Sequence, residues 1–277
     1  MTILYHSNCM DGLASAYVAK QAFPDAKALP ISYDDNPSTI TDDAELLFVD
    51  FCPSKNWLKE NSNKYKYITI IDHHKINVEP ILELNLPNVV VHFDNTESGA
   101  TLTSRILLGA EVSGVNALAY VRDRDLWEWK LPFSKEYSEG LRHRTIPNSL
   151  DSFTKAIQTP IHELQSVGTL LVEAKNSRVN SKIENAISIY INNVHCVCIN
   201  ATTDISELGN ALCNFHNKPS ATYQIGPKGE VWWSFRSLNS LHPVDELAKS
   251  LGGGGHRNAS GATTDLIFLQ TILKGQQ

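Results

Sequence analysis

A short apolar run that ends in three metal-competent side chains constrains this chain more than any other feature. Tyr67–Ile71 is rich in β-branched residues and is typical of a strand buried in a sheet. Asp72, His73 and His74 follow it directly. Open α/β sheets bind ligands at the carboxyl ends of their strands, and a carboxylate with two imidazoles is costly to bury unpaired. By itself the motif fits a metal site and a loop with ordinary surface histidines about equally well.

Three further apolar segments end in the same way, which shifts the balance towards a metal site. Thr2–Tyr5 leads into a polar loop, and Leu46–Val49 and Ala117–Val121 lead into acidic residues. The candidate ligands that follow these segments are His6, Cys9, Asp11, Asp50, Asp123 and Asp125. One aspartate after a strand is commonplace, because aspartate also caps helices and starts turns. Four converging ends with a histidine pair among them favour a metal site.

Strand-like and helix-like segments alternate along the first half of the chain, which predicts a mostly parallel sheet covered by helices on both faces. Besides the strands above, we expect strands over 26–32 and 89–91 and helices over 12–22, 54–61, 98–108 and 115–121. A mixed segment with several turn signals follows, and 161–191 has the apolar spacing of a long helix.

A second, smaller α/β unit is expected from about residue 194. Its predicted elements are a strand over 195–199, a helix over 205–215, a hairpin of 222–225 with 231–235, and a helix over 243–251. The predicted fold class is therefore α/β. It comprises a parallel-sheet N-terminal domain over 1–160, a helical connector over 161–192 and a smaller α/β C-terminal domain over 193–277.

A run of four glycines, Gly252–Gly255, stands directly before His256 and Arg257. Such a run carries a large conformational entropy cost. It makes sense where backbone N–H groups must approach a phosphate closely. The alternative is a flexible linker, but a linker rarely ends in His-Arg and resumes as Ala-Ser-Gly before a strand. The pattern favours a phosphate-binding loop.

Composition narrows the classes of partner. The net charge of −6 argues against a broad basic surface for long duplex DNA, and leaves room for a small basic pocket that binds a short phosphorylated ligand. The five cysteines are odd in number and show no paired framework, which predicts a reducing, cytoplasmic compartment. No apolar run approaches the roughly 20 residues of a membrane span, and no N-terminal signal is visible, so we expect no membrane partner.

Together these motifs resemble those of the DHH phosphoesterases that carry a DHH-associated C-terminal domain. The residues that carry the resemblance are Asp11-Gly12, Asp50, Asp72-His73-His74 and the segment from Gly253 to Gly261. The resemblance covers nearly the whole chain. The family includes RecJ-type exonucleases, nano-RNases, cyclic-dinucleotide phosphodiesterases and phosphatases of 3′-phosphoadenosine phosphate. It implies hydrolysis of phosphate esters by water activated between two divalent ions, usually manganese.

The resemblance also implies metal-binding roles for the matching acidic residues. Asp50 would bridge the two ions. Asp11, His73 and an acidic residue of a fourth motif would hold one of them. Asp123 is preferred for that last position, because the segment before it matches the family's helix-then-aspartate pattern, and Asp125 is the fallback.

The remaining matched residues would handle the substrate. His74 would face the scissile phosphate, and Asp72 would orient the imidazoles. The residues that would grip the substrate's phosphate or terminal nucleotide are Arg236, Gly253, Gly254, Gly255, His256 and Arg257.

The first motif departs from the usual family pattern. Many members have two aspartates one residue apart before the glycine, and Cys9 stands in place of the first. A His-x-x-Cys-x-Asp-Gly form of this kind resembles one branch of the family. A thiolate is a softer ligand than a carboxylate and favours zinc or iron over manganese. If Cys9 is instead a spectator, His6 or Asn8 would complete the site.

We expect a metal-dependent phosphodiesterase or exonuclease that acts on a short single-stranded oligonucleotide or a small phosphorylated nucleotide. Two alternatives stay open. One is a phosphomonoesterase of nucleoside bisphosphates or other small molecules. The other is a nucleotide-binding sensor without turnover, which Cys9 in place of a carboxylate motivates. The oligomeric state is also open, with a homodimer as one option.

Overall fold

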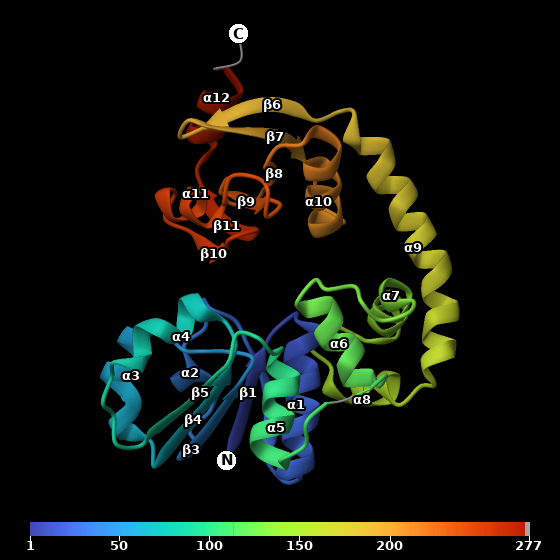
Figure 1. The fold of residues 1–277 in the computed structure, drawn as a ribbon. Helices are drawn as coiled ribbons and strands as arrows, with labels where there is room; N and C mark the ends of the chain where they lie inside the picture. The colour runs from blue at the N-terminus through green and yellow to red at the C-terminus, as the bar shows by residue number, and fades with distance from the viewer. Residues whose placement is uncertain (113, 275–277) are drawn as a thin grey trace. The chain divides into compact units, whose positions relative to one another are not determined.

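The computed structural model describes residues 1–112 and 114–274, and it divides into two compact units, Met1–Val172 and Glu173–Gln277 (Figure 1). Each unit has its own sheet and its own apolar core. The division falls inside the long helix α9, Ile161–Ile183. Within the described ranges, none of the helices combines the length and the apolar character that crossing a membrane requires.

The first unit is built on a five-stranded sheet in which every neighbouring pair is parallel. In spatial order its strands are β2 (Lys27–Ile31), β1 (Thr2–His6), β3 (Glu45–Val49), β4 (Tyr67–Asp72) and β5 (Val89–Phe93). These are the strands expected from the apolar runs. The predicted α/β class with a parallel N-terminal sheet is confirmed.

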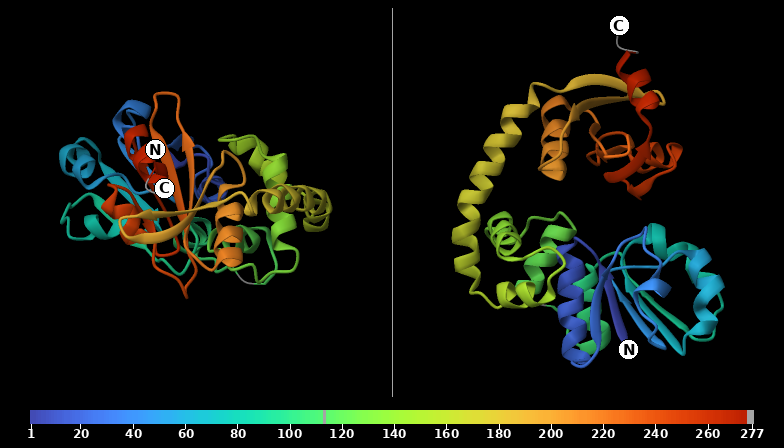
Figure 2. Two further views of the ribbon diagram at one scale, coloured as in Figure 1. Left: turned by 90° about the horizontal axis from the view of Figure 1, so that it is seen from above. Right: turned by 180° about the vertical axis from the view of Figure 1, so that it is seen from behind.

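Side chains alternate across this sheet, so both of its faces are apolar and both are covered. Ile3 and Tyr5 of β1 belong to one core cluster, whereas Leu4 between them belongs to another. Helices α1 (Met10–Ala22) and α5 (Gly99–Leu108) cover the first face. Helices α3 (Lys55–Asn61) and α4 (Lys75–Leu82) cover the second. The rear view in Figure 2 shows this three-layer arrangement.

The first unit has two further short elements before β5 and three further helices after it. They are α2 (Pro37–Ile40), the 3₁₀ turn Ser62–Lys64, α6 (Ala117–Asp125), α7 (Ser134–Arg144) and α8 (Leu150–Ile157). The sequence predicted only a mixed segment with turns where α7 and α8 lie. Both helices form because each contributes apolar side chains to the core, such as Tyr137 and Phe153.

The second unit contains a six-stranded, mostly antiparallel sheet. In spatial order its strands are β10 (Gly254–His256), β11 (Ala259–Thr264), β9 (Val231–Arg236), β8 (Ser220–Ile225), β7 (Val194–Asn200) and β6 (Ile187–Ile191). Its helices after α9 are α10 (Ile205–His216), α11 (Asp245–Ser250) and α12 (Leu266–Lys274). The predicted hairpin of β8 and β9 is present.

The prediction of one helix from 161 to 191 is wrong at its end. The helix stops at Ile183, and Ile187–Ile191 forms β6 against β7. Ile189 and Ile191 are buried, while Tyr190 between them is exposed. Burial with a period of two is the pattern of a strand with one covered face. Pairing with β7 therefore decides the structure of this segment, although the apolar spacing before it is helical.

The glycine run is part of the second sheet and not a linker. A Cβ on Gly253 would lie 2.0 Å from the carbonyl oxygen of Gly261, and one on Gly255 would lie 2.5 Å from Cα of Ser260. Gly255 also has a φ of +139°, which residues with a side chain rarely adopt. Gly253 and Gly255 are therefore required by close packing against β11.

Candidate metal centre

The candidate ligands gather where three neighbouring parallel strands end. His6 ends β1, Asp50 follows β3 and Asp72 ends β4. Asp11 lies in the first turn of α1, which follows β1. Neighbouring parallel strands place their carboxyl ends at one edge of the sheet. The convergence expected from the sequence is present in the fold.

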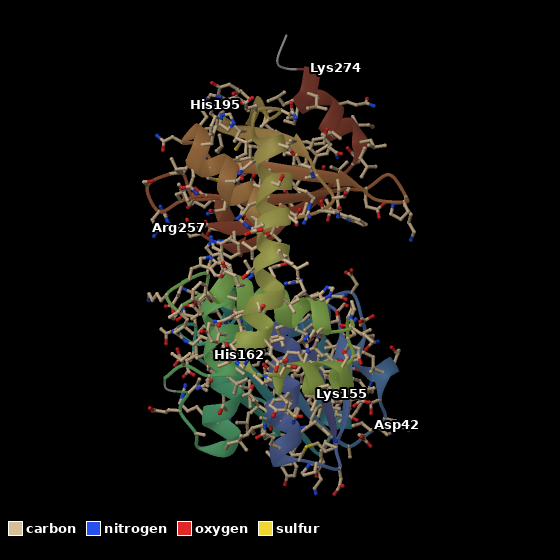
Figure 3. The ribbon with its side chains drawn as sticks, turned by 90° about the vertical axis from the view of Figure 1, so that its right-hand side faces the viewer. Asp42, Lys155, His162, His195, Arg257 and Lys274 are labelled. Carbon is tan, nitrogen blue, oxygen red and sulfur yellow. The ribbon has the colours of Figure 1, made fainter. Side chains whose placement is uncertain are left out.

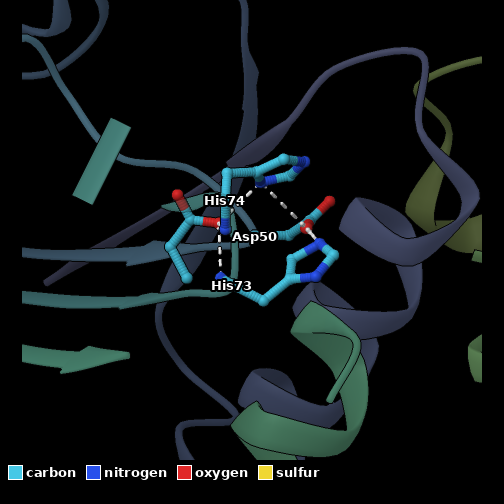
Figure 4. Close-up of side chains that lie close together, drawn as sticks. Asp50, His73 and His74 are labelled. Atoms are coloured by element: carbon cyan, nitrogen blue, oxygen red, sulfur yellow. Dashed lines mark hydrogen bonds and ion pairs between the residues drawn. The ribbon is translucent and has the colours of Figure 1, made fainter. Parts of the chain in front are cut away.

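His73 lies at the centre of a cluster of carboxylates. Its Nε2 is 3.2 Å from Asp50 Oδ1, 3.5 Å from Asp125 Oδ2 and 3.8 Å from Asp11 Oδ2. In Figure 4, dashed lines lead from the Asp50 carboxylate to the rings of His73 and His74. Asp11, His73 and Asp125 offer ligand atoms within 4.8 Å of one another. They form the first candidate metal group.

Asp50 also takes part in a second candidate group, with His6 and Cys9. Its Oδ2 is 3.5 Å from His6 Nδ1, whereas its Oδ1 faces His73. Cys9 is partly exposed and precedes α1 without using its side chain to cap the helix. One carboxylate thus lies between two sets of ligands, which is the position expected of a residue that bridges two ions.

Asp72 forms hydrogen bonds with both histidines that follow it. Its Oδ1 accepts hydrogen bonds from the backbone N–H groups of His73 and His74, at 2.8 and 3.2 Å, and lies 2.7 Å from His74 Nδ1. A carboxylate that binds one ring nitrogen fixes the orientation of the imidazole and leaves the other nitrogen for a ligand or substrate.

Several buried polar atoms of this cluster form no hydrogen bond within the described residues. Those without a hydrogen-bond partner are Asp50 Oδ1, Asp50 Oδ2, Asp72 Oδ2, His73 Nε2 and His6 Nδ1. Buried polar groups are otherwise almost always paired, because leaving one unpaired costs about 1–3 kcal/mol. A mixed set of carboxylate, imidazole and thiol ligands suits divalent transition ions. The residues present therefore fit bound metal.

The electrostatics of the cluster point the same way. Burial, together with the neighbouring carboxylates of Asp125 and Asp50, raises the pKa of Asp11 well above its usual range. Burial opposes protonation of His73, but the carboxylates of Asp50, Asp125 and Asp11 raise its pKa to about 10. Burial also raises the pKa of the Cys9 thiol well above its usual range, with Asp50 adding to the effect. Carboxylates this close together repel one another when ionised, and a bound divalent cation would offset that repulsion.

Asp125, and not Asp123, lies with the other candidate ligands. Both are in the last turn of α6. Asp123 Oδ1 accepts a hydrogen bond from the Lys130 N–H at 2.8 Å, and its Oδ2 accepts one from the Leu131 N–H at 3.3 Å. Asp123 therefore holds the loop after α6, and the sequence-based preference for it as the ligand does not match its placement.

Gly99 supports two candidate ligands, and it is not among the residues that we predicted for the site. Its backbone N–H and that of Ala100 donate hydrogen bonds to the Asp11 carboxylate. A Cβ on Gly99 would lie 2.6 Å from Cβ and Oδ1 of Asp50, which itself has a φ of +55°. Only a glycine allows both contacts. The Ser98-Gly99 pair at the start of a predicted helix is the signal that could have revealed it.

We expect Gly99→Ala to lower metal affinity and any metal-dependent activity by about 10-fold to 100-fold, because the added methyl group must displace Asp50. Isothermal titration of metal into the stripped protein measures this. Gly109→Ala is the matched control: it alters the other end of α5, where nothing lies within 4 Å of the added Cβ. Because Gly109 has a φ of +63°, this variant is expected to lose stability without losing metal affinity. Equal metal affinity of the Gly99 and Gly109 variants would contradict the expectation.

The candidate substrate-binding residues of the C-terminal domain lie on or next to two strands of the second sheet. Arg236 ends β9, Gly254–His256 form β10, and β11 lies between these strands. The Arg236 guanidinium donates hydrogen bonds to Ser206 Oγ at 2.8 Å and Ser234 Oγ at 2.9 Å. His256 and Arg257 are exposed, and Figure 3 labels Arg257. Exposed basic side chains beside a tightly packed glycine strand leave the predicted phosphate contact sterically open.

Sequence comparison gives two distant relatives that match almost the whole chain. Uncharacterized protein R106 of Acanthamoeba polyphaga mimivirus is 26% identical over 94% of this chain. Oligoribonuclease NrnB of Bacillus subtilis is 26% identical over 96% of it. The chain spans 66% and 73% of the lengths of these two relatives. No family model matches the chain.

Solved structures share the fold at low sequence identity. An exopolyphosphatase-related protein from Bacteroides fragilis has a TM-score of 0.59 at 14% identity, with 99% of this chain and 90% of that one covered. RecJ from Thermus thermophilus, in complex with Mn²⁺, has a TM-score of 0.57 at 15% identity, with 99% and 51% covered. The chain shares its fold with these proteins, as the resemblance to the DHH phosphoesterases implies. The pGpG-specific phosphodiesterase PggH from Vibrio cholerae also shares this fold, with a TM-score of 0.53 at 13% identity over 100% of this chain and 97% of that one.

Proposed function

We propose that this protein uses divalent metal ions to hydrolyse phosphodiester bonds in short oligonucleotides or small nucleotides. The observation that carries the proposal is the position of Asp50, a buried carboxylate whose two oxygens form no hydrogen bond and face two different ligand sets. The names of two similar proteins support the substrate class. One is called an oligoribonuclease and the other a pGpG-specific phosphodiesterase, and both names denote short substrates.

Asp11, His73 and Asp125 would hold one ion, and His6 and Cys9 would hold the other. Asp50 would contribute to both, because its Oδ1 lies 3.2 Å from His73 and its Oδ2 lies 3.5 Å from His6. Bound divalent ions lower the pKa of water towards neutrality and offset the negative charge that develops on phosphoryl oxygens. We propose manganese as the ion, because the similar RecJ was solved with Mn²⁺. The thiol of Cys9 makes zinc and iron the competing choices at the second position.

The chain's own residues would position the reacting phosphate. His74 is held by Asp72 through Nδ1, so its Nε2 is the atom that would donate a hydrogen bond to a phosphoryl oxygen. In the second unit, Arg236 and the β10 strand would bind the phosphate or the terminal nucleotide. The five cysteines are free thiols, which supports a reducing, cytoplasmic location for this activity.

The test is hydrolysis of 5′-labelled RNA and DNA oligomers, from dinucleotides to about twenty nucleotides, by metal-stripped protein with and without added ion. Manganese, zinc, iron and magnesium are added separately. We expect mononucleotide release that requires added metal, is lost with a chelator and is fastest on the shortest oligomers. Turnover of a nucleoside bisphosphate but of no dinucleotide would replace the proposal with a phosphomonoesterase. Nucleotide binding without turnover under any ion would replace it with a sensor.

A further inference from the structure

A pocket of about 430 Å³ opens on the first unit, and the proposed metal chemistry leaves it unused. Tyr33 and Phe51 line it. Phe51 directly follows Asp50, and the ring centroids of Tyr33 and His6 are 5.3 Å apart. Pockets that bind small organic molecules measure about 300–1,000 Å³. The pocket thus has room for a nucleoside beside the candidate metal ligands.

The aromatic side of this pocket ends in the solvent-exposed ring of Tyr33. Tyr33 stacks on Phe51, with ring centroids 4.8 Å apart and planes at 24°. Phe51 is 2% exposed, whereas Tyr33 is 50% exposed. The Tyr33 hydroxyl accepts a hydrogen bond from Asn77 Nδ2 at 2.8 Å, which limits rotation of the ring. A fixed, half-exposed ring on a buried stack provides a surface on which another flat ring can stack.

The polar groups of the pocket suit the uncharged part of a nucleotide. Asn36 Oδ1 accepts hydrogen bonds from Ser38 N and Trp57 Nε1, so its amide nitrogen stays available as a donor within the described residues. The charged lining side chains are Asp34, Asp35 and Lys55, which give a net negative lining. Carboxylates repel phosphate, and an amide can hydrogen-bond a base edge. Base and sugar are therefore favoured as the occupant.

We infer that this pocket binds the nucleobase next to the scissile phosphate, with the Tyr33 ring as its stacking surface. The inference rests on the proposed function, because the candidate metal ligands beside the pocket fix where the phosphate would lie. Stacking of a base on an aromatic side chain is worth about 5-fold to 150-fold in binding and tolerates any base. The pocket would make a phosphodiester that carries this base a better substrate than one that lacks it.

The test compares pApA with two analogues in which one or the other adenine is missing. We expect wild-type kcat/KM to fall about tenfold or more when one particular base is absent. Tyr33→Ala lowers kcat/KM by a similar factor on pApA and by less than about twofold on that abasic analogue. Tyr33→Phe keeps most of the wild-type rate because it keeps the ring. Tyr67→Ala is the matched control, since Tyr67 is 57% exposed and lies at the opposite end of β4.

The two kinds of failure are distinguishable. If Tyr33→Ala lowers the rates on pApA and on both abasic analogues equally, Tyr33 supports the metal site and binds no base, and the inference is overturned. If wild-type protein hydrolyses none of the three with any ion, the proposed function fails. Equilibrium dialysis with adenosine 5′-monophosphate then decides on the pocket. Equal affinities of wild type and Tyr33→Ala overturn the inference, and weaker binding by the variant supports it.

Discussion

Asp50→Asn is expected to lower metal-dependent phosphodiester hydrolysis by about a thousandfold, because several kcal/mol of transition-state charge stabilisation depend on the metal and each 1.36 kcal/mol is a factor of ten. The side chain is 0% exposed and is nearly the same size after substitution. Its neutral amide, however, has one acceptor oxygen where the carboxylate has two. Loss of the Asp50 carboxylate would therefore affect the group that it forms with His6 and Cys9, and also His73 of the other group, whose Nε2 is 3.2 Å from Asp50 Oδ1. Hydrolysis of a labelled dinucleotide with saturating ion measures the effect.

Thermal unfolding gives a readout that does not depend on activity. A metal that binds only the folded state, present at a concentration of about 1,000 times its Kd, stabilises that state by about 4 kcal/mol. We expect the wild-type Tm to rise on adding metal and the Tm of the Asp50 variant to stay nearly unchanged. Asp42→Asn is the matched control, because Asp42 is exposed and precedes β3, whereas Asp50 follows it. A metal-induced rise in Tm as large in the Asp50 variant as in the control would exclude Asp50 as a ligand.

The fold of the first unit was predictable because its strands are short and apolar, and because the segments between them have the different apolar spacing of helices. Tyr67–Ile71 needs both faces covered, and a parallel sheet supplies this. The starts of two helices were predictable from local sequence as well: the helices expected from 54 and 98 begin directly after Ser54 and Ser98, whose side chains accept the hydrogen bonds that a cap requires. These are local rules, and local rules act within a few residues.

The errors arose where longer-range packing decides. The segment at Ile187–Ile191 follows a helix with suitable spacing, and only pairing with β7 makes it a strand. The choice between Asp123 and Asp125 depends on which backbone N–H groups return to the helix end, and no spacing rule encodes the path of that loop. Gly99 matters because of its distance from Asp50, 49 positions earlier in the chain.

The two aspartates of α6 should respond in opposite ways to the same substitution. Burial, opposed by His73 and reinforced by Asp50, raises the pKa of Asp125, so its carboxylate is held at a cost in the metal-free protein. Asp125→Asn removes that cost, and we expect the metal-free Tm to stay level or rise. Metal affinity and hydrolysis should fall by about 100-fold or more, because a charged ligand is lost. Paired metal titrations and melting curves measure both effects.

Asp123→Asn should do the reverse. The Asp123 carboxylate accepts hydrogen bonds from two backbone N–H groups, and an amide can satisfy only one of them with its oxygen. Hydrogen bonds to charged groups contribute about 1.5–3 kcal/mol, so the Tm should fall with and without metal. Metal affinity should remain within about threefold of wild type, which is less than 1 kcal/mol. Because both variants change one residue in the same helical turn, a loss of metal affinity in Asp123→Asn with none in Asp125→Asn would reverse the assignment and restore Asp123 as the ligand.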